Sequence, residues 1–79
     1  MDKKYKHSEK YIRLGLNIAY YRKLRGLTQI QLAEAVNVSR THISNIEAPN
    51  MPVSVSLDKL FDIADALDVS VYRLFDFKD

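Results

Sequence analysis

The chain has 79 residues, and this length limits it to one domain with a small core. It contains no cysteine, which excludes a disulfide framework and a thiolate metal site, and no apolar run approaches the roughly 20 residues that span a bilayer. The net charge is +2, but residues 1–48 carry nine Lys/Arg and four Asp/Glu, whereas residues 49–79 carry three and six. A basic first half suits an anionic partner, although an ordinary solvated surface would show the same bias.

Residues 1–8 are polar and charged without periodicity, so we expect them to form a flexible basic arm. No apolar stretch follows them, so they do not resemble a signal peptide. Together with the missing cysteines, this favours a cytoplasmic protein. Residues 9–79 are expected to form one helix-rich domain, because only two glycines and two prolines interrupt the chain.

The first predicted helix begins near Ser8 or Glu9 and runs to about Arg25, and Gly26 is well placed to end it. Apolar residues three to four positions apart indicate its buried face. They are Leu14, Ile18 and Tyr21.

The stretch 27–47 predicts two short helices joined by a tight turn, covering about residues 29–36 and 40–48. Thr28 is a candidate N-cap, and Gln31 three residues later completes the spacing of a capping box. Ser39 is a second candidate N-cap. Asn37 lies between the two helices and tolerates the left-handed conformation of a sharp turn. Helix, turn, helix is the motif whose second helix enters the DNA major groove.

The remainder of the chain predicts a loop and two further helices. Pro49 and Pro52 exclude a helix between them. Ser56 and Ser70 are candidate N-caps for a longer and a very short helix. The apolar stripe of the longer helix is Leu57, Leu60, Ile63, Ala64 and Leu67. Its aspartates lie on a polar face without His or Cys, which favours a solvated surface over a metal site.

Two runs in this chain, RKLRGLTQIQLAEAVNVSRTHISNIE and LDKLFDIADALDVSVYRLF, together resemble the lambda-repressor/Cro-like (Xre-type) helix-turn-helix family. The likeness covers about Leu14 to Phe75. It implies an all-α, compact five-helix DNA-binding domain whose third helix reads the major groove. The chain departs from the family at Asn37, where Gly is usual, and at Ala48-Pro49, where a Gly and a shorter loop are usual.

The resemblance implies which side chains face DNA. Arg40 and Thr41 match positions that commonly contact base edges, as does Asn45, while Gln29 matches one that bonds phosphate and braces the first recognition residue. Arg40 could instead hold a phosphate or Glu34 on the surface, and Thr41 could meet a thymine methyl or a phosphate. The full set of predicted DNA-binding residues is Gln29, Ser39, Arg40, Thr41, Ser44 and Asn45.

Two further groups are expected to be structural. Arg22 and Glu47 match positions that often form an ion pair between the first and third helices. The chain has many aromatic residues for its length, and those near its end offer more apolar surface than one small monomer easily buries, which suggests a self-complementary dimer patch. Its candidates, which could alternatively close the base of the monomer core, are Val53, Val55, Tyr72, Phe75 and Phe77.

These observations favour a sequence-specific, double-stranded DNA-binding transcriptional regulator, either a repressor or a controller protein. We expect a homodimer on a partly palindromic operator. The alternative is a protein-interaction module on the same fold, such as an antitoxin or adaptor. We expect no enzymatic activity, metal, cofactor or membrane contact, because the sequence contains no visible nucleophile–base pair or metal-ligand cluster.

Overall fold

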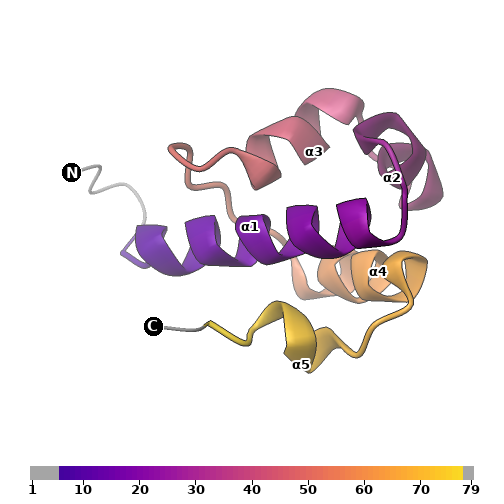
Figure 1. Cartoon of the computed structure of the whole chain (residues 1–79). Coiled ribbons are helices and arrows are strands. Elements are labelled where there is room, and N and C mark those ends of the chain that lie inside the picture. The colour runs from indigo at the N-terminus through magenta and orange to yellow at the C-terminus, as the bar shows by residue number, and fades with distance from the viewer. Residues whose placement is uncertain (1–5, 78–79) are drawn as a thin grey trace.

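The computed structural model describes residues 6–77, and within this range the chain forms five α-helices and no strands (Figure 1). The helices are α1 (Ser8–Leu24), α2 (Gln29–Ala35), α3 (Arg40–Glu47), α4 (Leu57–Leu67) and α5 (Val71–Leu74). The expected all-α, five-helix fold is therefore confirmed. The first three helices each end one residue before the predicted bound, because Arg25, Val36 and Ala48 are their C-caps.

The expected N-terminal arm falls only partly in the described range. Residues 1–5 lie outside the described residues, as do residues 78–79 at the end of the expected domain. Residues 6 and 7 form a turn, and Ser8 is the first residue of α1.

Helix α1 runs through the centre of the fold. It packs against α3 on one side and against α4 and α5 on the other, while α2 contacts both α3 and α4 (Figure 1). The buried apolar side chains between the helices form one core, which places α3 at the edge of the molecule with its inner face anchored. These side chains are Leu14, Ile18, Leu32, Ala33, Val36, Ile43, Ile46, Leu60, Ile63, Ala64, Leu67 and Leu74.

The caps of α2, α3 and α4 are present as predicted. In the capping box, the main-chain N–H of Gln31 donates to Thr28 Oγ1 over 3.0 Å, and the N–H of Thr28 donates to Gln31 Oε1 over 2.8 Å. The hydroxyls of Ser39 and Ser56 accept from main-chain N–H groups at 3.0 and 3.2 Å. Ser70 differs, because its side chain makes no capping bond and only its carbonyl accepts, from the N–H of Arg73 at 2.9 Å.

Left-handed residues end two helices and shape the turn. Gly26 (φ 75°) follows α1 and Asn37 (φ 59°) joins α2 to α3, as predicted. Asp68 (φ 56°) ends α4 in the same conformation, which the sequence did not indicate. The guanidinium of Arg25, the C-cap residue of α1, donates to the carbonyl oxygens of Leu67 and Asp68 at 2.7 and 3.1 Å, so it supplies donors for the C-terminal end of α4.

Two residues that the sequence predicted to be in the core are not fully buried. Leu57 is 62% exposed, because it is the first residue of α4 and lies at the margin of the helix's apolar face. Tyr21 is only partly buried, whereas Gly15 and Arg22 of α1 are buried. The inner face of α1 therefore includes a charge and a glycine that apolar periodicity cannot reveal.

Candidate nucleic-acid interface

The outer side of α3 carries the polar residues that the sequence singled out. Arg40 and Thr41 are exposed in its first turn, and Ser44 and Asn45 are half-buried one turn later. The opposite side of the helix packs into the core through residues 43, 46 and 47. Because core contacts hold the inner side, the outer side can present four polar side chains to a ligand without rearrangement of the fold.

A buried ion pair holds α3 against α1. Arg22 donates from Nε to Glu47 Oε2 at 2.7 Å and from Nη2 to Glu47 Oε1 at 3.0 Å. The Arg22 and Glu47 side chains are only 9% and 5% exposed. Arg22 also donates from Nη1 to the carbonyl oxygen of Leu27 at 2.7 Å. The pair therefore joins α1, the connection to α2, and the last residue of α3.

Gln29, the first residue of α2, extends this pair to the surface. Its Nε2 donates to Glu47 Oε1 over 3.0 Å, and its Oε1 accepts from Arg40 Nη1 over 3.4 Å. The four residues Arg22, Glu47, Gln29 and Arg40 form a continuous set of polar contacts that we call the polar relay. It runs from the buried interior to the exposed N-terminal end of α3.

Gly15 is a positioning residue that the sequence prediction missed. A Cβ atom added to this buried residue would overlap the carbonyl oxygen of Ile46 and lie 2.9 Å from the carbonyl carbon. Glycine inside a helix is unfavourable, and this cost is a signal that could have identified the position.

Lys59 was also missed. Its Nζ donates to the carbonyl oxygen of Val36 at 2.6 Å, at the C-terminal end of α2. A main-chain carbonyl that α2 leaves without a helical partner is thereby satisfied from α4. Lys59 and Arg25 both bind main-chain carbonyl groups, so they act as structural cations within the fold.

The five predicted dimer residues divide into two groups. Tyr72 and Phe75 are 65% and 46% exposed. The other three, Val53, Val55 and Phe77, are partly buried against the chain's own core. Next to the exposed pair, a Coulombic interaction with Tyr72 and a hydrogen bond to Tyr21 raise the pKa of Arg73.

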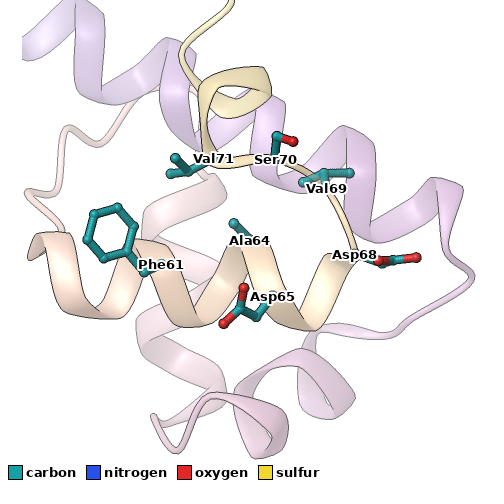
Figure 2. Close-up of a pocket in the computed structure, with 7 residues that line it drawn as sticks. All are labelled: Phe61, Ala64, Asp65, Asp68, Val69, Ser70 and Val71. Carbon is teal, nitrogen blue, oxygen red and sulfur yellow. The ribbon is translucent and has the colours of Figure 1, made fainter.

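Two surface hollows lie away from the polar side of α3. Figure 2 shows the first, between α4 and residues 69–71, with Phe61, Asp65 and Val71 among its lining residues. The second lies between α1 and the C-terminal segment. None of the predicted DNA-binding residues lines either hollow. The candidate interface is thus the outer side of α3 and not either of these hollows.

Two negative findings apply to residues 6–77. This range contains no group of three or more Asp, Glu or His side chains arranged to hold a metal ion. None of the helices described here is both long enough and apolar enough to cross a membrane.

Comparisons with known proteins agree on one family. Residues 18–74 match the helix-turn-helix family. The transcriptional regulator SinR of Bacillus licheniformis is 36% identical over 66 residues, which are 84% of this chain and 59% of SinR, so this chain spans about three fifths of that relative. The control protein C.SmaI of Serratia marcescens is 38% identical over 61 residues, covering 77% of this chain and 70% of C.SmaI.

A solved structure supports the same family. The crystal structure of SinR in complex with DNA superposes with a TM-score of 0.72 and 36% sequence identity. The superposition covers 80% of this chain and 98% of the SinR chain, which is described as a master regulator for biofilm formation.

Proposed function

The chain belongs to the helix-turn-helix family of the lambda-repressor/Cro-like (Xre) type, and from this membership we propose that it binds specific double-stranded DNA sequences and regulates transcription. The observation that carries the proposal is the outer side of α3, where Arg40 and Thr41 stand exposed above a firmly packed inner side. The relatives named as transcriptional regulators and the SinR–DNA complex support it.

In this proposal α3 enters the major groove. A helix of eight residues is about 12 Å long, and the groove is wide enough to admit an α-helix. Arg40 at the N-terminal end can donate two hydrogen bonds to a guanine, and Asn45 can bind an adenine edge. Thr41, Ser44 and Ser39 supply short polar contacts to bases or phosphates.

Gln29 contributes to DNA binding mainly through another residue. Its side-chain amide is already bonded to Glu47 and to Arg40. A phosphate contact at this position would therefore use the main-chain N–H of Gln29, while its side chain braces Arg40.

We further propose that the chain acts in the cytoplasm as a twofold homodimer, as a repressor or controller of transcription. The interface would be centred on Tyr72 and Phe75, whose exposed rings offer apolar area that one monomer does not bury. Residues 53, 55 and 77 are partly buried against the chain's own core and would contribute only their remaining exposed area. Two recognition helices would then enter successive major grooves about 34 Å apart on a partly palindromic operator.

The alternative, a protein-interaction module, fits the surface less well. Such a module would expose acidic or large apolar side chains on the outer side of α3, and the residues found there are Arg40, Thr41, Ser44 and Asn45.

The proposal is tested by selecting bound duplexes from a random pool with the purified chain. We expect enrichment of two inverted half-sites with a fixed spacing. A pool that stays random after repeated selection would refute sequence-specific binding, and enrichment of single half-sites would refute the dimer.

A further inference from the structure

We infer that Glu47 is a positioning residue for base recognition, which acts on Arg40 through Gln29. The inference rests on the proposed function, because Arg40 is taken as the residue that reads a base. It goes further by giving the buried ion pair a role in specificity in addition to its role in packing.

The chemistry of the three side chains allows only one arrangement. The ionised carboxylate of Glu47 can only accept hydrogen bonds, and the guanidinium of Arg40 can only donate them. The amide of Gln29 has one donor end and one acceptor end. Glu47 must therefore bind the amide nitrogen of Gln29, which leaves the amide oxygen facing Arg40. Turning the amide over would bring two acceptors together at Glu47 and two donors together at Arg40.

Glu47 itself is held in place from the interior. Arg22 binds both of its carboxylate oxygens, and Glu47 Oε1 is shared between Arg22 Nη2 and Gln29 Nε2, each at 3.0 Å. Both charged side chains are buried, so the carboxylate has little room to reorient. The orientation set in the interior is thereby passed to the surface through Gln29.

The contact with Gln29 restricts Arg40 before DNA arrives. An arginine side chain on the surface samples many rotamers, and fixing it on binding reduces affinity. Arg40 uses only one Nη1 donor for Gln29 at 3.4 Å, so its other donors remain available for a base. The polar relay thus restricts the conformations of the Arg40 side chain and still leaves most of its hydrogen-bond donors free for DNA.

The test is the double variant Arg22→Met/Glu47→Met. Replacing both partners of a buried ion pair with apolar residues of similar length is often neutral or stabilising, whereas removal of one partner leaves an unpaired charge. We expect the variant to remain folded by circular dichroism and thermal unfolding. At the operator position read by Arg40, the ratio of the affinity for the preferred base pair to the affinity for each of the other three should fall about threefold to tenfold.

Two further variants sharpen the result. Gln29→Ala keeps the ion pair but interrupts the relay, and it should lower the same base preference without an additional loss when it is combined with the double variant. Gln31→Ala is the matched control, since Gln31 lies on the same helix and serves only the cap of α2. Its base preferences should equal those of the wild type.

A folded double variant with wild-type preference at the base pair read by Arg40 would overturn the inference and leave the proposed function intact. A wild-type chain that selects no DNA sequence would instead overturn the proposed function. In that case the link from Glu47 to Gln29 is still tested by NMR without DNA. We expect the side-chain amide protons of Gln29 to exchange with water faster in the double variant, and an unchanged exchange rate would overturn the inference.

Discussion

Gly15 of α1 lies directly against the main chain of Ile46 in α3, so closely that any side chain at position 15 would overlap the Ile46 carbonyl group. The two helices therefore meet backbone to backbone at this point. The buried Arg22–Glu47 ion pair joins the same two helices further along α1. Together these contacts fix where α3 stands relative to the rest of the domain, and hence where its outer residues are presented.

Gly15→Ala should destabilise the fold. Alanine is the better helix former by about 0.5–1 kcal/mol, so propensity alone predicts a gain in stability. Overpacking against Ile46 should instead cost about 1–3 kcal/mol in the free energy of unfolding, measured with denaturant. An increase in stability would contradict the close approach of the two helices. For comparison, Gly26→Ala meets no atom within 4 Å and should show only the cost of its left-handed conformation, about 1–2 kcal/mol.

Glu47→Ala should be among the most damaging single substitutions, because it leaves the Arg22 guanidinium buried and unpaired. The expected loss is about 3–5 kcal/mol in the free energy of unfolding without DNA. Glu9→Ala provides the same substitution at a largely exposed glutamate, which pairs with the partly buried Arg13 at 3.1 Å, and should cost less than about 1 kcal/mol. Equal losses for the two variants would show that burial does not determine the strength of the central pair.

Arg40→Ala should weaken binding to the selected operator by about 1–3 kcal/mol and remove the preference at one base pair of each half-site. Affinities would be measured on the operator and on all single-base variants of it. Lys23→Ala removes one charge from the exposed surface of α1 and serves as the control, with base preferences unchanged. If affinity fell equally for every duplex, Arg40 would contact a phosphate and not a base.

Tyr72→Ala combined with Phe75→Ala should raise the dissociation constant of the dimer, because exposed aromatic anchors dominate interface energetics, at about 2 kcal/mol or more for each hot spot. Molar mass against protein concentration, from light scattering or sedimentation, would record the shift. Ile30→Ala removes an exposed apolar side chain from α2, and should leave the mass curve unchanged. If the double variant gave the same curve of molar mass against concentration as the wild type, the dimer interface would not include Tyr72 and Phe75.

Much of the fold could be predicted because its signals are local. The capping box of Thr28 and Gln31, the cap at Ser39 and the left-handed Asn37 each depend on a few neighbouring residues. Apolar spacing similarly indicated most of the core. The prediction was wrong at Leu57 because spacing does not show how much of a helix its neighbours cover.

The contacts that organise the candidate site are not local. The bond between Gln29 and Glu47 joins residues 18 positions apart, and the one between Lys59 and Val36 joins residues 23 apart. Whether such side chains meet depends on how the helices are placed in space, which periodicity does not determine. The family resemblance implied the pairing of Arg22 with Glu47, but the link from that pair to Gln29 required the structure.

The central claim is that α3 recognises a specific DNA sequence, and the ratio of two affinities tests it most directly. The dissociation constant would be measured for the selected operator and for a scrambled duplex of equal length and composition, at physiological salt. We predict that the operator is bound at least about 10³-fold more tightly, as is typical of specific recognition. Equal affinity for the two duplexes would contradict the account, because the electrostatic attraction of phosphates alone does not distinguish sequences.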